Sequence, residues 1–358
     1  MRDLLTTTFS GQRVLLTGHT GFKGAWLLHL LHSVQAHSYG YALPPEQEDE
    51  LSATMDPHLR QPETLEDIRS GTSLSAILRE FQPQFIIHMA AQSLVRRSYQ
   101  NPALTFEVNV SGTLRLLEAI RQHASALTSH PLVVLIVTTD KVYENLEKGI
   151  PFRESDPLGG HDPYSASKAA CELLCASYRR SFFPDPSVVC LLTARAGNVI
   201  GGGDRAPDRL IPDIIRAWQK GHAARLRYPQ ATRPWQHVLE PLVAYLTLLA
   251  MARQNPSTFA RPWNIGPYPD QKLSVLEAAQ LFAAALGAPQ PLSDPSSTFH
   301  EAVYLSLNID DICRYTLWRP QLTMQEAIEW TARWETDPRP ATEKCMEQIQ
   351  QYFNLWKS

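Results

Sequence analysis

Short apolar runs alternate with longer amphipathic stretches through the first part of the chain. Val14–Thr17, Phe85–His88, Leu132–Thr138 and Val188–Leu192 are apolar almost throughout, which is typical of strands buried on both faces of a parallel sheet. Ala36–Ala42 predicts a further strand. The stretches between them predict helices, among them Leu74–Phe81, Thr105–Arg121 and one that begins near Asp162. This alternation predicts an α/β fold with a Rossmann-type doubly wound parallel sheet.

A glycine-rich turn joins the first strand to the first helix. It reads Gly18-His19-Thr20-Gly21-Phe22-Lys23-Gly24, a GxxGxxG spacing between a strand and a helix. Glycines allow a tight turn and let backbone amides approach a pyrophosphate at the helix N-terminus. The turn therefore predicts a dinucleotide site.

The second strand leaves the choice of dinucleotide open. Such a strand often ends in a carboxylate that holds the ribose hydroxyls of NAD. Here Gly40, Tyr41, Ala42 and Leu43 occupy the region, and no arginine stands there to hold a 2′-phosphate. The strand Phe85–His88 is followed by two small residues, Ala90 and Ala91. They would let a dinucleotide lie flat across the sheet edge.

The rhythm of the chain changes after Asn198. Prolines break the following stretch into short pieces, while Leu239–Met251 predicts a helix and Pro262–Gly266 a return to the sheet. Further helices are predicted from Val275 and from Met324. We therefore predict that residues 1–197 form the dinucleotide-binding domain, with 239–265 returning to it. Residues 198–238 and 266–358 are predicted to form a smaller mixed α/β C-terminal substrate lobe.

The composition is that of a globular protein of more than one average domain. The chain has 358 residues, 44% hydrophobic and 19% charged, and its net charge of −3 argues against a nucleic-acid surface. The five cysteines have no zinc spacing, and their odd number favours a reducing compartment. The first eight residues lack the apolar core of a signal peptide, and no apolar run is long enough for a membrane helix. A cytoplasmic enzyme without a metal is expected.

Tyr164 and Lys168 are four residues apart in a predicted helix. One helical turn separates them, so the phenol and the ammonium can lie side by side. A free tyrosine titrates near pH 10 and is a poor base, but an adjacent cation favours the phenolate. The pair is a candidate for removing a proton from a substrate hydroxyl.

Three polar residues follow the strand Leu132–Thr138 directly. Thr139, Asp140 and Lys141 stand at the carboxyl end of a central parallel strand, where open α/β sheets bind ligands. The cluster is therefore predicted to carry chemistry.

These motifs together resemble the extended short-chain dehydrogenase/reductase superfamily, and within it the 4,6-dehydratases that act on CDP-D-glucose. The closer match is carried by the turn Thr17–Gly24, by Gln92–Tyr99, Asp140–Asn145 and Asp156–Lys168, and by Ala194–Asp204 and Ala231–Pro241. The similarity runs from about Val14 to Trp334.

The resemblance implies bound NAD, a CDP-hexose substrate, a homodimer or homotetramer, and a place in deoxysugar biosynthesis of the O-antigen type. Tyr164, beside Lys168 and assisted by Thr139, would take the proton from the sugar 4-hydroxyl. Asp140, its pKa raised by burial, would protonate the departing 6-hydroxyl. Lys141 stands where the dTDP-glucose dehydratases have glutamate, and its duty stays open because an unperturbed lysine is a poor base at neutral pH.

The remaining site residues also come from the resemblance. In proteins of this kind the residue at Asp67 hydrogen-bonds the adenine, while Arg233 is the best candidate for the substrate diphosphate. The expected cofactor-binding residues are Gly18, Thr20, Gly21, Phe22, Lys23, Gly24, Asp67, Ile68, Ala90, Ala91, Gln92, Asn109, Tyr164 and Lys168. The expected substrate-binding residues are Ser93, Asn198, Arg209, Arg233, Trp235 and His237. Asn109, Trp235 and His237 could instead have purely structural roles.

Three alternatives stay open. A nucleotide-sugar 4-epimerase uses the same Tyr-Lys pair but needs no acid at C6, so the cluster Thr139–Lys141 argues against it. A dehydratase acting on a dTDP-, UDP- or GDP-hexose would share every motif above. A non-catalytic dinucleotide sensor would be expected to lack one member of the Tyr164–Lys168 pair.

Overall fold

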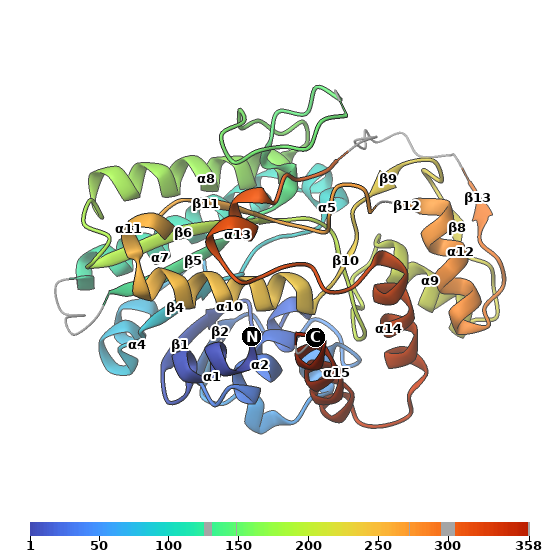
Figure 1. The fold of residues 1–358 in the computed structure, drawn as a ribbon, viewed down its shortest axis with the longest axis horizontal. Helices are drawn as coiled ribbons and strands as arrows, with labels where there is room; N and C mark the ends of the chain where they lie inside the picture. Colours follow the sequence, from blue (N-terminus) through green and yellow to red (C-terminus); the bar gives the residue numbers. More distant parts are fainter. Residues whose placement is uncertain (125–130, 148, 272, 295–304, 357–358) are drawn as a thin grey trace.

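The computed structural model describes residues 1–124, 131–147, 149–271, 273–294 and 305–356. Its centre is a seven-stranded sheet in the order β11-β6-β5-β4-β1-β2-β3, with every neighbouring pair parallel (Figure 1). The predicted fold class is confirmed. The strands are β1 (Arg13–Thr17), β2 (His37–Ala42), β3 (Glu63–Leu65), β4 (Phe85–His88), β5 (Leu132–Val137), β6 (Val189–Ala196) and β11 (Pro262–Ile265).

The chain changes direction across the sheet at β1. From β1 it proceeds outward to β2 and β3, and then returns to the other side through β4, β5 and β6. Connections on the two sides of such a switch point diverge, which leaves a crevice at the carboxyl ends of the strands. The glycine turn leaves β1 at this crevice, and Thr17 of β1 is in register with Tyr41 and His88 on the two neighbouring strands.

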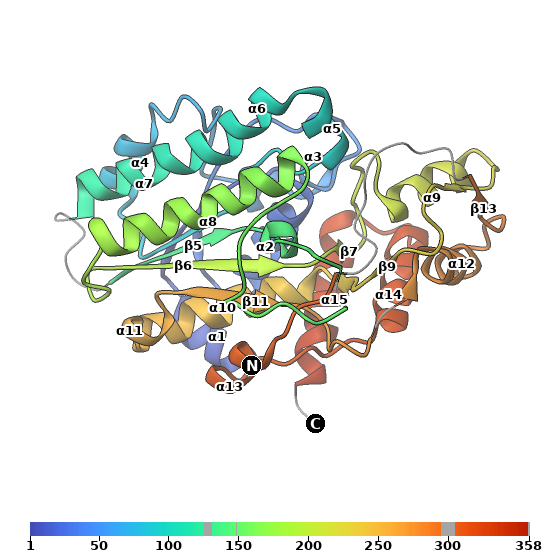
Figure 2. The same cartoon turned by 90° about the horizontal axis from the view of Figure 1, so that it is seen from above.

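Helices cover both faces of the sheet (Figure 2). Side chains of successive strand residues point to opposite faces, so Leu15 joins the core under one helical layer while Leu16 joins the core under the other. The first layer contains α4 (Leu74–Phe81), α7 (Gly112–His123) and α8 (Pro163–Ser181). The second contains α1 (Arg2–Phe9), α2 (Phe22–Ser33), α10 (Leu239–Gln254) and α15 (Ala341–Leu355).

Two helices of the second layer are buried on nearly all sides. In α10, 13 side chains from Leu239 to Ala252 are buried, and in α2 every residue from Gly24 to Leu31 is buried. This follows from their position between the sheet and the other helices of this layer, since α15 packs against α2 and α1 packs against α10. Within the described ranges, no helix is long and apolar enough to cross a bilayer.

The helix predicted over Thr105–Arg121 is interrupted. The structure has α6 (Pro102–Phe106), a π-helical turn over Glu107–Ser111, and then α7. Asn109 lies inside the π turn and is buried. Such turns insert one residue into the helical ladder and re-aim the side chains near it.

The smaller lobe packs around a core of its own. Ile214 of α9 (Leu210–Gln219), Phe282 of α12 (Val275–Leu286) and Ile328 of α14 (Met324–Thr336) meet in it. α12 and α14 each begin with a capping box, Ser274 with Glu277 and Thr323 with Glu326. Three strand pairs complete the lobe: β7 (Val199–Ile200) with β10 (Gln236–His237), β8 (Arg225–Leu226) with β13 (Leu292–Ser293), and β9 (Thr232–Arg233) with β12 (Leu273–Ser274).

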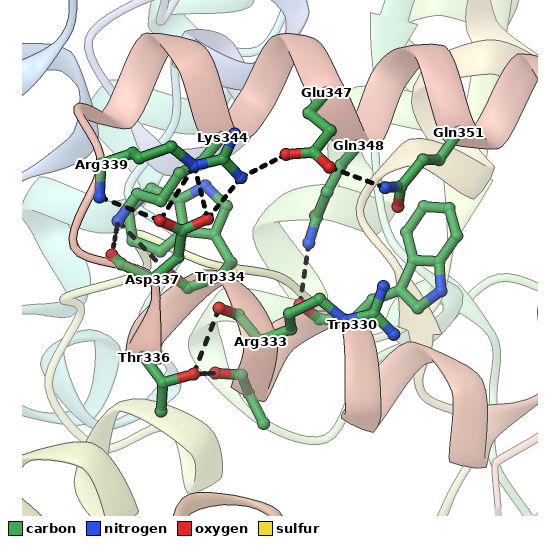
Figure 3. Close-up of polar contacts among 11 residues, drawn as sticks. Trp330, Arg333, Trp334, Thr336, Asp337, Arg339, Lys344, Glu347, Gln348 and Gln351 are labelled. Carbon is green, nitrogen blue, oxygen red and sulfur yellow. Dashed lines mark hydrogen bonds and ion pairs between the residues drawn. The ribbon is translucent and has the colours of Figure 1, made fainter.

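The turn between α14 and α15 is fixed by polar contacts (Figure 3). Arg339 pairs with both Asp337 and Glu347, and Lys344 Nζ donates to the carbonyls of Trp334 and Asp337 at 3.1 and 3.2 Å. The turn brings α15 back against α2, where Ile349 joins the same core as Trp26. The last helix of the range predicted for the smaller lobe thus packs on the sheet layers. The remaining short elements are α3 (Leu51–Thr54), α5 (Val95–Gln100), α11 (Pro256–Phe259), α13 (Asp310–Tyr315) and single 3-10 turns at Pro57–Leu59 and Asp140–Val142.

Candidate active site

A cavity of about 770 Å³ lies where the carboxyl edge of the sheet meets the smaller lobe. It runs from the glycine turn and the ends of β2 and β4 to α9 and β8. Most residues predicted from the sequence line it: Gly18, Thr20, Gly21, Phe22, Lys23, Gly24, Asp67, Ile68, Ala90, Ala91, Gln92, Ser93, Thr139, Lys141, Tyr164, Asn198, Arg209, Arg233 and Trp235. Asn109, Asp140, Lys168 and His237 do not line it.

The glycine turn leaves no room for a side chain at Gly18 or Gly24. Gly18 has φ +77°, and a Cβ atom there would lie 2.6 Å from the Ala90 amide nitrogen. A Cβ atom on Gly24 would lie 2.1 Å from the Gly18 carbonyl oxygen. Gly21 is the N-cap of α2 and lines the cavity, so the N-terminus of this helix is presented to it. These features fit the pyrophosphate of a dinucleotide.

His19 occupies the space beside β2. A Cβ atom on Gly40 would lie 2.7 Å from its ring, and its Nε2 is 2.6 Å from Glu63 Oε2 on β3. Thr20 Oγ1 donates to the Leu43 carbonyl at 2.8 Å. The turn is thereby fastened to the end of β2, and the absence of a carboxylate at Gly40 has a packing reason.

Asp67 lines the cavity but is paired with an arginine. Its carboxylate accepts from the Arg69 backbone amide at 2.8 Å and from the Arg69 guanidinium at 2.7 Å. The hydrogen bonds from Arg69 hold the pKa of Asp67 below its usual value. Asp67 is therefore a carboxylate held in one orientation at this end of the cavity.

Tyr164 and Lys168 lie one turn apart on α8. The helix is started by Asp162, whose carboxylate accepts from the Ser165 amide at 3.0 Å, with Pro163 in the first turn. Lys168 Nζ is buried and donates to the Val137 carbonyl at 3.2 Å. This bond directs the ammonium towards the end of β5, next to the residues that follow that strand.

Burial dominates the pKa values of both residues. It raises the pKa of Tyr164 to about 12, against the effect of a hydrogen bond with Thr139. It also lowers the pKa of Lys168. A further positive charge in the cavity, beside that of Lys168, would favour the Tyr164 phenolate.

Asp140 is buried directly behind the cavity wall. Its Oδ1 accepts from Thr139 Oγ1 at 3.0 Å, whereas Oδ2 has no hydrogen-bond partner among the described residues. A Cβ atom on Gly197, which does line the cavity, would lie 3.2 Å from Oδ2. Burial raises the pKa of Asp140, the direction that an acid needs.

Lys141 points to the cavity from the same turn. Its backbone amide donates to Thr139 Oγ1 at 3.4 Å, and its side chain is half-buried on the cavity wall. Thr139, Asp140 and Lys141 thus form one cluster, and the Thr139 hydroxyl joins it to Tyr164.

Asn109 supports the site from behind. Its amide donates to the Gln92 carbonyl at 3.0 Å and to Ser167 Oγ at 2.8 Å, and its oxygen accepts from the Gln92 amide at 2.8 Å. The π turn points this side chain at the end of β4 and at α8 together. Asn109 therefore positions Gln92 rather than lining the cavity itself.

The two arginines predicted to bind substrate, Arg209 and Arg233, are held by backbone and side-chain partners. Arg209 donates to Asp204 at 3.0 Å and to Ser93 at 3.2 Å, which joins the smaller lobe to the sheet side. Arg233 is buried and donates to the Thr232 carbonyl at 2.9 Å. Asn198 and Trp235 line the same cavity.

His237 lies away from the cavity. It is fully buried between the rings of Trp26 and Trp330, at centroid distances of 5.8 and 5.5 Å. Burial lowers its pKa to about 3, so the imidazole is neutral. The structure does not bring it to the other predicted substrate-binding residues.

Several cavity residues were not predicted. Arg96, Asp208 and Arg227 line the cavity wall, and Tyr245 of α10 lies behind it, 3.5 Å from Lys23 Nζ. The frequency of arginine between Arg205 and Arg233 was a signal for Arg227 alone. Tyr245 is surrounded by apolar residues in the sequence, so no sequence signal indicated a place near the cavity.

Fold and site together define a Rossmann-type protein of the extended short-chain dehydrogenase/reductase class. The chain belongs to the GDP-mannose 4,6 dehydratase family, whose model matches residues 15–261. It is 38% identical over 331 residues to the CDP-glucose 4,6-dehydratase of Salmonella typhimurium, covering 91% of each chain. It is 26% identical to dTDP-glucose 4,6-dehydratase 1 of Escherichia coli, over 90% of this chain and 92% of that one.

Solved structures of the same class superpose on the model. A dTDP-glucose 4,6-dehydratase from Streptomyces venezuelae, crystallised with NAD, has a TM-score of 0.75 at 26% identity, covering 90% of this chain and 96% of that one. A UDP-glucose 4-epimerase from Thermus thermophilus, also with NAD, has a TM-score of 0.74 at 25% identity, covering 90% and 98%.

Proposed function

We propose that this chain removes water from CDP-D-glucose to give CDP-4-keto-6-deoxy-D-glucose, with bound NAD. The observation that carries the proposal is the cluster at the end of β5. Thr139 hydrogen-bonds a buried Asp140 carboxyl and also lies in hydrogen-bonding reach of the Tyr164 phenol. An acid next to the base of a Tyr-Lys pair is what a dehydration at C6 requires and what an epimerisation does not.

NAD is the proposed dinucleotide. The glycine turn fits a pyrophosphate, and the carboxylates Glu46, Glu50, Glu66 and Asp67 line the end of the cavity beside β2 and β3. Asp67 and Glu46 are paired with Arg69 and Arg97, so Glu50 and Glu66 are the carboxylates that would disfavour an additional 2′-phosphate by charge repulsion. When bound, NAD supplies a hydride acceptor for C4 and a hydride donor for C6, and its positively charged ring favours the Tyr164 phenolate.

Tyr164 is proposed as the base that takes the 4-hydroxyl proton. Its phenol lines the cavity, and Lys168 lies one helical turn further along α8. Removal of this proton turns C4 into a ketone as its hydrogen leaves with the electron pair. The ketone then acidifies the C5 proton.

Asp140 and Lys141 are proposed for the elimination. Asp140 is proposed to give the proton to the departing 6-hydroxyl, and burial raises its pKa in the direction that this role needs. Lys141 lines the cavity wall beside it, and the neutral amine form of this lysine is the candidate to take the C5 proton and become an ammonium. Water leaves, C6 gains the hydride, C5 regains a proton, and the net change is the loss of one water.

The substrate phosphates are assigned to Arg233, with Asn198, Arg209, Trp235 and Ser93 beside it. Arg233 is buried at the cavity wall, where a guanidinium can hold phosphate oxygens through two N–H groups. His237 is retained only as a support for this wall.

We further propose a homodimer or homotetramer that acts in the cytoplasm, in deoxysugar biosynthesis of the O-antigen type. Large apolar side chains are exposed on one helical layer, at Phe106, Leu114, Leu173 and Phe182, and a second copy of the chain would cover them. All five cysteines are free thiols, which fits a reducing compartment.

The test is incubation of the purified protein with CDP-, dTDP- and UDP-glucose, followed by mass spectrometry. Loss of one water from CDP-glucose is the expected result. An unchanged mass with a changed sugar configuration would identify a 4-epimerase. Loss of water from dTDP- or UDP-glucose in preference would move the proposal to another nucleotide, and no conversion of any of them would favour a dinucleotide sensor.

A further inference from the structure

The segment before α9 lines the cavity and contacts both of its sides. Asp208 lies in this segment, directly before Arg209. Its Oδ1 accepts from Arg96 Nη1 of α5 at 3.1 Å and from Arg227 Nη1, just after β8, at 2.9 Å. One carboxylate oxygen is therefore shared by two guanidinium groups, one from the sheet side and one from the smaller lobe.

Asp208 is held in this position against its backbone preference. Its φ is +62°, in the left-handed region that side chains other than glycine rarely adopt. Arg227 Nη2 also donates to the Asp208 carbonyl at 3.3 Å, so the two arginine contacts accompany the unusual backbone. A non-glycine residue in this conformation is a reason to look for a functional constraint.

Two arginines share the Asp208 carboxylate. Arg96 and Arg227 both donate to it, and Arg227 is also 3.9 Å from Asp213, which pairs in turn with Arg216. The Asp208, Arg96 and Arg227 side chains are 38%, 35% and 30% exposed and line the cavity. Ion pairs with this exposure contribute little stability, so a more highly charged anion can replace the carboxylate at small cost.

We infer that Arg96 and Arg227 form an anion-binding position for the phosphoryl oxygens of a nucleoside diphosphate, which Asp208 fills while no substrate is bound. This rests on the proposed function, because it takes the substrate to be a nucleotide sugar, and it adds a second pair of arginines to Arg233. A phosphate oxygen can accept hydrogen bonds from both arginines, as Asp208 Oδ1 does, and a phosphate group carries more negative charge than a carboxylate. Arg–phosphate contacts are among the stronger hydrogen bonds.

Binding of CDP and of cytidine, measured by calorimetry on the full chain saturated with NAD, tests the inference. Arg96→Gln and Arg227→Gln should each raise the Kd for CDP about tenfold. Asp208→Asn removes the competing charge and should lower that Kd about threefold. Cytidine, which has no phosphate, should bind all variants alike.

Matched variants separate this effect from misfolding. Arg121→Gln changes an exposed arginine that pairs with Glu118 and does not line the cavity, and it should bind CDP like the unchanged protein. Asp208→Gly removes the carboxylate and suits the left-handed backbone, so it should tighten CDP binding as Asp208→Asn does. Thermal melting checks that each variant is folded.

Two results would overturn the inference. CDP binding unchanged in both arginine variants would show that they do not hold phosphate. Weaker CDP binding in both Asp208 variants would show that the carboxylate positions the arginines instead of standing in for the ligand. Either result, with normal dehydration of CDP-glucose by the unchanged protein, leaves the proposed function intact; failure of the unchanged protein to bind CDP would count against the proposed function itself.

Discussion

The hydroxyl of Thr139 donates a hydrogen bond of 3.0 Å to Asp140 Oδ1 and lies in hydrogen-bonding reach of the Tyr164 phenol. A single side chain from the end of β5 therefore touches both the proposed base and the proposed acid. Because a hydroxyl has one proton to give, it can support the carboxyl or the phenolate at any moment, but not both. The two proton transfers are expected to depend on each other through this residue.

The first prediction concerns the pH dependence of turnover. The hydrogen bond from Thr139 lowers the pKa of Tyr164 against the larger effect of burial. Thr139→Val removes it, so the limb on which activity rises with pH should move up by about one pH unit. Thr139→Ser keeps the hydroxyl and should leave the limb in place. Superimposable profiles for the valine variant and the unchanged protein would show that Thr139 does not act on Tyr164.

A second prediction concerns the proposed acid. Asp140→Asn keeps the shape of the side chain and can still accept from Thr139, but it cannot supply a proton. Oxidation at C4 should proceed while loss of water slows by about a hundredfold or more. Rapid mixing with CDP-glucose, followed by the absorbance of the reduced dinucleotide, should show an intermediate that accumulates. Loss of water at the normal rate would place the acid elsewhere.

Stability depends on a buried ion pair beneath the site. Glu172 of α8 accepts from Arg195 at 3.0 Å and from the hydroxyls of Thr138 and Thr193 at 2.6 and 2.8 Å. Glu172→Gln leaves the Arg195 charge buried without its counter-charge, and we expect a loss of about 3–5 kcal/mol in the free energy of unfolding, measured with urea. Arg121→Gln breaks an exposed pair with Glu118 and should change little. Equal effects of the two substitutions would contradict the electrostatic explanation.

Glu240 should make the stability depend on pH. This carboxylate in α10 is buried, no cation pairs with it in the part of the chain that the structure describes, and it accepts from the Gln321 and Leu322 amides and from the Tyr352 hydroxyl. Burial raises its pKa to about 7, so the folded protein binds this proton more tightly than the unfolded chain does. The stabilisation that protonated Glu240 contributes is fully present below the pKa that this carboxyl has in the unfolded chain. It is lost as the pH rises through 7.

From pH 6 to pH 8 the free energy of unfolding should fall by about 1 kcal/mol because Glu240 loses its proton. Glu240→Gln keeps an acceptor for both amides but cannot ionise, so its unfolding free energy should lack this component between pH 6 and pH 8. Denaturation in urea at the two pH values measures it. The same pH dependence in the glutamine variant would assign it to another group.

The parts of the fold that the sequence predicted are those with a strong local signal. Continuous apolar runs such as Phe85–His88 can only be satisfied by burial on both sides, and β4 has these same bounds. β3 is three residues long, and α1 is an eight-residue helix at the start of the chain, so neither has enough periodicity to be recognised. The π turn at Glu107–Ser111 was missed because its cause is the contact of Asn109 with distant segments.

The candidate site shows the same difference between local and tertiary features. The residues of the glycine turn, and likewise Tyr164 and Lys168, are close in sequence, so their spacing predicts their geometry. Asp208 and Arg227 meet Arg96 only through tertiary structure, and nothing in the local sequence indicates that these three side chains are in contact. His237 shows the converse: it stands in a polar-aromatic cluster of the sequence, but the fold places it between Trp26 and Trp330.

The central claim is that the hydrogen removed from C4 returns to C6 of the same sugar. CDP-glucose carrying deuterium at C4 tests it, with the product analysed by nuclear magnetic resonance and mass spectrometry. The account predicts a 4-keto-6-deoxy product that has lost one water and carries the deuterium at C6. Deuterium found again at C4 of an unchanged or epimerised sugar, or lost to the solvent, would contradict it.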